Sequence, residues 1–417
     1  MIGLVDGNNF FVSCERIFNL RLQGRPVAVL SNNDGCVVSR SNEFKALNIP
    51  MGTPYFQLRD LIKSYGLVLI SSNYELYGDI SHRIMEILHE FSDAIEQYSI
   101  DEAFINLKRP GSDYYSCAKE IRNTILQWVG VPCGVGFAQT KTLAKIANHI
   151  GKKSKDGIFV MPEDPSEILA ETPVEDVWGV GRRLAPKLQR IGICTAQQLA
   201  SSDLESMRHR FSIMLVRTML ELRGQSVVEE EKEEVLSQSI SWSRCFGQPV
   251  VEYEDLAESV AHYTSRAAEK LRKEGQCAAG IRIYFQFYPE YRPHLLDGGV
   301  DTVHFVFEHP TASTSEMLSQ ITPKLSPIFR KGRRYKKSGI LFFGLEREEP
   351  AQLSLFQPSE KTVQHKKLSA VRDQLNRQYG RGSIFNLSEG ISKKWQMRRE
   401  HLSPEYTTDW NQLLRVK

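Results

Sequence analysis

Residues 98–104 place two adjacent carboxylates, Asp101 and Glu102, between apolar residues of the kind that form a protein core. Neighbouring residues of a strand point to opposite faces, so both acids can reach one site only where a strand ends or turns. We therefore predict a β-hairpin whose arms are residues 94–100 and 104–107.

The first residues of the chain supply a third acid. Residues 1–6 form a short apolar run that ends in Asp6, which is typical of a buried strand whose tip reaches a cleft. We expect Asp6, Asp101 and Glu102 to meet there. Clustered carboxylates repel one another unless they are protonated or neutralised, and hard divalent cations are their usual partners. The pattern predicts a magnesium site and phosphate chemistry.

Length and composition indicate several domains in a soluble protein. The chain has 417 residues, of which 41% are hydrophobic and 25% charged. No apolar run approaches the roughly 20 residues that span a bilayer, so we expect a cytoplasmic protein without membrane contact. The seven cysteines include no Cys-x-x-Cys pair, which argues against a disulfide framework or a zinc site.

The other elements fit a split β-α-β-β-α-β plan, which places the acids on its middle strands. We predict helices at 8–20, 75–91, 113–128 and 140–150 and a strand at 131–138. Two short strands, at 27–30 and 36–39, form a small insertion after the first helix. Within that helix we expect at least one of Phe10 and Phe11 to be core, while the other forms the floor under a nucleotide sugar.

Two regions have features suited to DNA. Glycines 179 and 181 allow a tight turn that exposes backbone N–H groups at the start of a helix, as in a helix-hairpin-helix that grips phosphates; an ordinary glycine turn is the alternative. Residues 324–337 contain seven Lys or Arg and no acid, and form either a nucleic-acid surface or a solvated face. The predicted DNA contacts are Gly179, Gly181, Arg182, Arg330, Lys331, Arg333, Arg334 and Lys336.

Together these motifs resemble the Y-family DNA polymerases. The matching segments are residues 6–11, 99–102, 141–147, 178–181 and 352–356, and the tail from 395 to 417 resembles that of UmuC-type catalytic subunits. The resemblance implies an α+β multidomain right hand with a ferredoxin-like palm. It implies palm at 1–24 and 75–164, fingers at 25–74, a helix-hairpin-helix thumb at 165–228, a linker at 229–240, an α+β little finger at 241–346, and a clamp-binding peptide with a C-terminal docking tail at 347–417.

The resemblance implies template-directed, error-prone translesion synthesis, with nucleotidyl transfer from a dNTP to a primer 3′-hydroxyl. Asp6 and Asp101 would bridge two Mg²⁺ ions, Glu102 would complete one metal site and the carbonyl of Gly7 the other. Phe11 matches the family's steric gate against ribonucleotides, with Phe10 beside it. The residues that match triphosphate contacts are Ser39, Lys45 and Lys152.

The same resemblance implies protein partners. Residues Gln352, Leu353, Leu355 and Phe356 would bind the sliding clamp, and the polar tail, which has the composition of a docking segment rather than a packed domain, would engage a processed UmuD-type dimer and the RecA filament. Two other functions remain open. A palm-type nucleotidyl cyclase needs no DNA-gripping hairpin or clamp peptide, and a non-catalytic clamp- and DNA-binding adaptor has no reason to retain three repelling acids.

Overall fold

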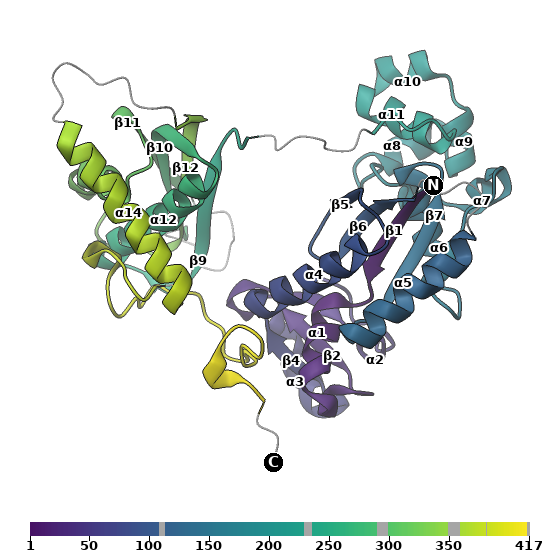
Figure 1. Ribbon diagram of the computed structural model, residues 1–417, viewed down its shortest axis with the longest axis horizontal. Coiled ribbons are helices and arrows are strands. Elements are labelled where there is room, and N and C mark those ends of the chain that lie inside the picture. Colours follow the sequence, from purple (N-terminus) through teal and green to yellow (C-terminus); the bar gives the residue numbers. More distant parts are fainter. Residues whose placement is uncertain (108–112, 229–235, 290–298, 349–358, 381, 415–417) are drawn as a thin grey trace. The chain divides into compact units, whose positions relative to one another are not determined.

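The computed structural model describes residues 1–107, 113–228, 236–289, 299–348, 359–380 and 382–414 (Figure 1). The chain forms two compact units. The first comprises residues 1–31, 35–233 and 401–417, and the second comprises residues 32–34 and 234–400. The predicted clamp peptide, residues 352–356, and residues 229–235 of the predicted linker lie outside the described residues.

The first unit is built on a five-stranded sheet in the order β5-β6-β1-β7-β8. Strand β1 (Ile2–Gly7) lies between β6 (Glu102–Asn106) and β7 (Cys133–Ala138) and is antiparallel to both. The edges are β5 (Ile95–Gln97) and β8 (Ile158–Val160). This order confirms the predicted split β-α-β-β-α-β plan, with β8 added beside β7.

Alternation along the strands gives the sheet two apolar faces. One face carries Val5, Ala103 and Val135, which pack in one core with residues of three helices. These helices are α1 (Phe10–Phe18), α4 (Tyr74–His89) and α5 (Tyr114–Trp128). The other face carries Leu4 and Phe104, which pack with α6 (Lys141–Gly151).

Helix α6 lies unusually close to the sheet because β7 has a glycine beneath it. A Cβ on Gly136 would stand 2.2 Å from the backbone nitrogen of Asn148. The Asn148 side chain also donates a hydrogen bond to the carbonyl of Leu4, at 3.2 Å. The lysines of α6 are therefore held over the end of the sheet that carries the acids.

Two smaller parts complete the first unit. A three-stranded sheet of β3 (Val37–Arg40), β2 (Val27–Leu30) and β4 (Val68–Ser71) packs with α2 (Asn42–Lys45) and α3 (Tyr55–Tyr65) around its own apolar core. The sequence predicted β2 and β3 but not β4. Five short helices follow the main sheet: α7 (Ser166–Glu171), α8 (Ala185–Arg190), α9 (Ala196–Ser201), α10 (Leu204–Arg210) and α11 (Ile213–Leu222).

The second unit has a four-stranded antiparallel sheet in the order β11-β10-β12-β9. Its strands are β9 (Ile240–Val250), β10 (Gln276–Phe287), β11 (Val300–Thr311) and β12 (Tyr335–Arg347). Helices α12 (Tyr253–Lys273) and α13 (Thr314–Ile321) pack with it around a separate hydrophobic core. This is the predicted second α+β domain.

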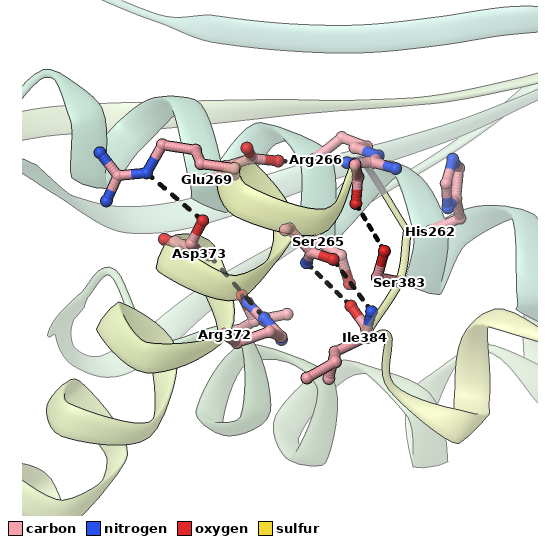
Figure 2. A network of polar contacts seen from close by, with 12 residues as sticks. His262, Ser265, Arg266, Glu269, Arg372, Asp373, Ser383 and Ile384 are labelled. Carbon is pink, nitrogen blue, oxygen red and sulfur yellow. Dashed lines mark hydrogen bonds and ion pairs between the residues drawn. The ribbon is translucent and has the colours of Figure 1, made fainter. Parts of the chain in front are cut away.

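The interpretation of the polar tail as a segment without packing was wrong for its described part. Helix α14 (Ser359–Tyr379) is joined to α12 because its Asp373, labelled in Figure 2, accepts two hydrogen bonds from Arg272, at 2.7 and 2.9 Å. Further on, Glu389 contacts His262 at 2.9 Å, and Trp395 is only 3% exposed. The tail packs through paired charges as well as apolar contacts, and such pairs leave no periodic pattern in its sequence.

Within the described residues, the helices are all too short or too polar to cross a membrane.

Candidate active site

Backbone pairing brings the three predicted acids to one end of the main sheet. Asp6 on β1 lies directly opposite Glu102 on β6, so the two side chains share a face. Directly beside this pair, the N–H of Gly7 donates to the carbonyl of Asp101 at 2.9 Å. Residues more than ninety positions apart therefore meet, as the hairpin interpretation expected.

Each acid side chain has a partner of its own. Lys152 contacts Asp6 at 2.6 Å, Lys145 contacts Glu102 at 2.9 Å, and the Ser99 hydroxyl donates to Asp101 at 2.6 Å. Within the described residues, no three His, Cys, Asp or Glu side chains gather closely enough to hold a metal ion as they stand. The structure thus brings together the predicted residues, but turns their carboxylates toward cations and a hydroxyl of the chain itself.

The electrostatics show that this pair of acids needs positive charge. Burial raises the pKa of Asp6 to about 7, although Lys152 acts in the opposite direction. Burial also acts to raise the pKa of Glu102, but its hydrogen bonds with Asp6 and Lys145 outweigh that effect and lower it. Of these two adjacent carboxyl groups, Asp6 is therefore the one that binds a proton more readily. Oxygen ligands that cannot both ionise without a neutralising charge fit a hard divalent cation.

Lys145 is held at this site by aromatic rings, a role that the sequence analysis missed. Its ammonium lies 4.3 Å from the centre of the Tyr98 ring and 5.5 Å from that of Trp178. Trp178 in turn donates a hydrogen bond to the Tyr98 hydroxyl at 3.3 Å. The sequence did contain one signal for this role: Lys141 and Lys145 are four residues apart, so both lie on one face of α6. Lys141 makes a similar ion pair, with Glu96 at 2.5 Å.

The two phenylalanines at the start of α1 have different surroundings. Phe10 is 2% exposed and belongs to the main core, which matches the expectation that at least one of the pair is structural. Phe11 is half-buried, and its ring stacks on Tyr77 of α4 with centroids 4.5 Å apart and planes 13° apart. Phe11 is therefore the ring available to a ligand, while Phe10 shapes the wall behind it.

Cations gather beside Asp6. Burial, Arg40 and Lys152 lower the pKa of Lys45, while Asp6 acts to raise it, so these groups interact electrostatically. Ser39 is buried on β3, next to Arg40. A convergence of cations near carboxylates is suited to a polyphosphate bound through metal ions. Arg40 was not among the predicted contacts, although it adjoins Ser39 in the sequence.

The predicted hairpin contacts lie in an exposed turn before α8. Gly179 has a φ of 92°, and a Cβ there would stand 2.9 Å from the Thr218 hydroxyl, so this turn requires glycine. The carbonyl of Gly181 accepts hydrogen bonds from the N–H groups of Leu184 and Ala185, and Arg182 is exposed.

In the second unit, the basic residues lie at the start of β12 and in the turn before it. Arg330, Lys331 and Arg334 are exposed, whereas Arg333 is paired with Asp301 at 2.6 Å and lies 4.1 Å from the centre of the Phe287 ring. The ring of Tyr288 lies 5.9 Å from the ammonium of Lys336. Arg333 is thus held within its own unit, while the three exposed cations can meet an external phosphate.

Comparison with known proteins places the whole chain in one family. The impB/mucB/samB family model matches residues 5–149, its helix-hairpin-helix model matches 162–193 and its C-terminal domain model matches 237–355. Residues 366–416 match a domain of unknown function.

Relatives extend over the same length. The chain is 42% identical to Protein UmuC of Salmonella typhimurium over 100% of both chains, and 35% identical to Protein MucB of Escherichia coli over 99% of both. It is 29% identical to DNA polymerase IV of Lactococcus lactis, over 64% of this chain and 75% of that protein.

The fold has solved counterparts. A Y-family DNA polymerase chimera of Dbh and Dpo4 superimposes with a TM-score of 0.65 at 21% identity, covering 83% of this chain and 100% of the chimera. An insertion ternary complex of Dbh DNA polymerase gives a TM-score of 0.56 at 20% identity, with the same coverage. From the match along its full length, the chain belongs to the impB/mucB/samB family as a UmuC-type member, and it has the fold of the Y-family DNA polymerases.

Proposed function

We propose that this chain is a DNA-directed DNA polymerase that carries out error-prone translesion synthesis, adding nucleotides from dNTPs to a primer 3′-hydroxyl. The similarity to DNA polymerase IV of Lactococcus lactis supports a polymerase. The observation that carries the proposal is the placing of Asp6 opposite Glu102, with Asp101 adjoining and with Lys45 and Lys152 close by. Acids beside clustered cations suit nucleotidyl transfer from a triphosphate.

Two divalent ions, which we propose to be Mg²⁺, would be held by Asp6, Asp101, Glu102 and the Gly7 carbonyl; they would supply the charge that activates the primer hydroxyl and stabilises the triphosphate. The chain's own groups would do the rest. Lys152, now on Asp6, and Lys45 would bind phosphate oxygens, and Lys145 would keep Glu102 oriented. Phe11 would exclude a sugar bearing a 2′-hydroxyl.

DNA would be held at two places. The N–H groups of the turn around Gly179 and Gly181, with Arg182, would grip the phosphate backbone of the duplex. The exposed cations Arg330, Lys331 and Arg334 would add further phosphate contacts, independent of sequence. A polymerase acting on chromosomal DNA in this way would work in the cytoplasm.

Partner binding is proposed only from the sequence resemblance of residues 352–356 and of the tail to UmuC-type subunits. The sliding clamp would bind residues 352–356, and a UmuD-type dimer and a RecA filament would bind the tail. A clamp pull-down comparing the wild type with Leu353→Ala and Phe356→Ala tests the first of these, and undiminished capture of both variants would refute it.

Primer extension with Mg²⁺ tests the catalytic proposal. We expect the wild type to extend a primer, and Asp6→Ala, Asp101→Ala and Glu102→Ala each to abolish extension while DNA binding is largely retained. Asp60→Ala, on the exposed side of α3, is the matched control and should be fully active. If a site variant still extends the primer, the residue that it lacks is not catalytic. DNA binding without extension by the wild type, even with clamp and accessory dimer, would indicate an adaptor instead.

A further inference from the structure

One face of α1 connects the proposed steric gate to the end of the chain. Phe11, Glu15 and Phe18 are spaced by four and three residues, so their side chains form a stripe along the helix. Phe11 stacks on Tyr77, Glu15 accepts a hydrogen bond from the Tyr77 hydroxyl at 2.7 Å, and Phe18 stacks on Tyr406 with centroids 4.8 Å apart. The stripe thus contacts α4 at one end and the C-terminal segment at the other.

Residues 401–406, which we call the C-terminal clip, are attached by hydrogen bonds to Ser71 and Asn73. The N–H of Ser71 donates to the carbonyl of His401 at 3.0 Å, and the N–H of His401 donates to the Ser71 hydroxyl at 2.9 Å. The side chain of Asn73 then donates to the carbonyls of Ser403 and Pro404, each at 3.2 Å. The clip is therefore seated at the end of β4 and the start of α4.

Ser403 links the clip to the stripe by a directed series of hydrogen bonds. Asn73 donates to the Ser403 hydroxyl at 3.0 Å, and that hydroxyl donates to Glu15 at 2.9 Å, on the same oxygen that Tyr77 contacts. The Asn73 carbonyl oxygen accepts from the N–H of Leu76 at 3.3 Å, which fixes the orientation of the amide. The Asn73 amide nitrogen thus contacts three acceptors of the clip, and one oxygen of Glu15 accepts from both Ser403 and Tyr77.

The carboxyl group at the centre of this series is buried. Glu15 is 2% exposed, and Asn73 and Tyr77 are each 0% exposed. Burial raises the pKa of Glu15, and the hydrogen bonds from Tyr77 and Ser403 oppose that rise. A buried carboxyl that loses one of its donors reorients or neutralises, because an unsatisfied polar group in the interior is costly. Tyr77 would follow such a change, since it is bonded to Glu15.

We propose that the C-terminal clip is a positioning element for the sugar gate: Ser403 holds Glu15, Glu15 holds Tyr77, and Tyr77 supports the Phe11 ring that selects deoxyribonucleotides. This inference rests on the proposed polymerase function. It assigns a role to the end of a region whose family model has no known function, residues 366–416. Ser403 acts through other residues and touches no substrate.

A purely structural clip would behave differently. Loosening it would lower the catalytic efficiency for ribonucleotides and deoxyribonucleotides in the same proportion, because all parts of the site would be affected alike. A positioning clip affects the ratio of the two efficiencies, because Phe11 matters only where a 2′-hydroxyl is present.

The test measures single-nucleotide primer extension by the full chain, with dNTP and rNTP in parallel. The variants are Ser403→Ala, which removes the donor to Glu15; Ser403→Thr, which restores a hydroxyl; and Tyr406→Leu, which removes the stack on Phe18. Phe11→Ala is the positive control for the gate, and Ser392→Ala is the matched control at an exposed position of the tail. Thermal unfolding of each variant records whether it is folded.

We expect Ser403→Ala to lower discrimination against rNTPs by about fivefold, the effect of one ordinary hydrogen bond, with dNTP efficiency changed by less than about twofold. Ser403→Thr and Ser392→Ala should match the wild type. If Ser403→Ala does not fold, Tyr406→Leu provides the test, and it should also lower the ratio of dNTP to rNTP efficiency.

Three results would overturn the inference. If Ser403→Ala leaves the ratio of dNTP to rNTP efficiency unchanged while Phe11→Ala strongly lowers it, the clip has no positioning role, and the polymerase function is unaffected. An equal loss for both nucleotides identifies a purely structural clip. Absence of extension by the wild type refutes the proposed function, and this inference with it.

Discussion

Lys145 of α6 contacts Glu102 of β6 at 2.9 Å while its ammonium lies over the face of the Tyr98 ring. The close approach of α6 to the sheet at Gly136 places the lysine there, and the ring of Trp178 confines it from another direction. A cation enclosed in this way keeps its charge at one carboxylate. This arrangement makes the lysine a positioning residue for an acid that we propose to bind metal.

Replacing Lys145 should reduce synthesis without abolishing it. In Lys145→Ala, the half-buried Glu102 carboxylate loses its cation and its orientation, and we expect kcat/KM for dNTP incorporation to fall by about tenfold. Lys145→Arg should retain most activity, because a guanidinium can also lie over Tyr98. Steady-state primer extension measures both. Lys119→Ala, at an exposed site on α5, should be unaffected, and full activity of Lys145→Ala would refute the role.

Gly136→Ala tests whether the contact between α6 and the sheet positions the site. The new methyl group would overlap the backbone of Asn148, so α6 must shift, and we expect a loss of about 3 kcal/mol in stability together with most of the activity. Gly78→Ala is the matched control on α4, where a Cβ meets nothing within 4 Å. That change should stabilise the helix by about 0.5–1 kcal/mol. Thermal unfolding and primer extension measure the two effects, and equal behaviour of the two variants would contradict the prediction.

The basic residues before β12 should divide into two kinds. Arg330→Gln and Lys331→Gln remove exposed charges, so each should weaken DNA binding equally across sequences and reduce the slope of log affinity against log salt concentration by about one. Arg333→Gln breaks an ion pair with Asp301 and should instead lower the unfolding temperature. Fluorescence anisotropy at several salt concentrations measures the slope. A loss confined to particular sequences would contradict backbone binding.

The sheet and the acids were predictable because their signals are local. Strands that end in acids, a hairpin, and helices with a regular apolar stripe define the split plan, and pairing of β1 with β6 then places Asp6 opposite Glu102. The sequence also predicted that at least one of Phe10 and Phe11 belongs to the core, and Phe10 does. The strand β4 was missed because its four residues are too few to show a period, although Gly66 ends α3 just before it.

The packing of the tail could not be predicted in the same way. Arg272 and Asp373 are 101 residues apart, and Glu15 and Ser403 are 388 apart. A single ion pair or hydrogen bond of this kind has no periodicity, so neither partner is distinguishable from an ordinary surface residue in the sequence. The aromatic surroundings of Lys145 could not be predicted either, because they come from the hairpin and from the turn at Trp178; only its spacing from Lys141 is visible in the sequence.

The tail's attachment to α12 should give the second unit an acid-sensitive stability. Burial acts to raise the pKa of Glu389, but hydrogen bonds from His262 and the Asn386 backbone outweigh it and lower the pKa to about 2, from an ordinary value of 4.5. A carboxyl group whose pKa is lowered by folding stabilises the folded state at pH values above its pKa in the unfolded chain. That stability, about 3 kcal/mol, is lost as the pH falls from about 5 to about 2.

Glu389→Gln should remove this dependence. At pH 7 the variant should unfold at a lower temperature than the wild type, because its neutral amide accepts a weaker hydrogen bond from His262. The gap should narrow as the pH is lowered from about 5 toward 3, because there the unfolded wild type binds a proton that the folded state does not. Calorimetry of the full chain at several pH values measures the gap, with Glu346→Gln, an exposed site on β12, as the control. A gap that stays constant with pH would show that Glu389 contributes packing and helix capping, and that its charge contributes nothing.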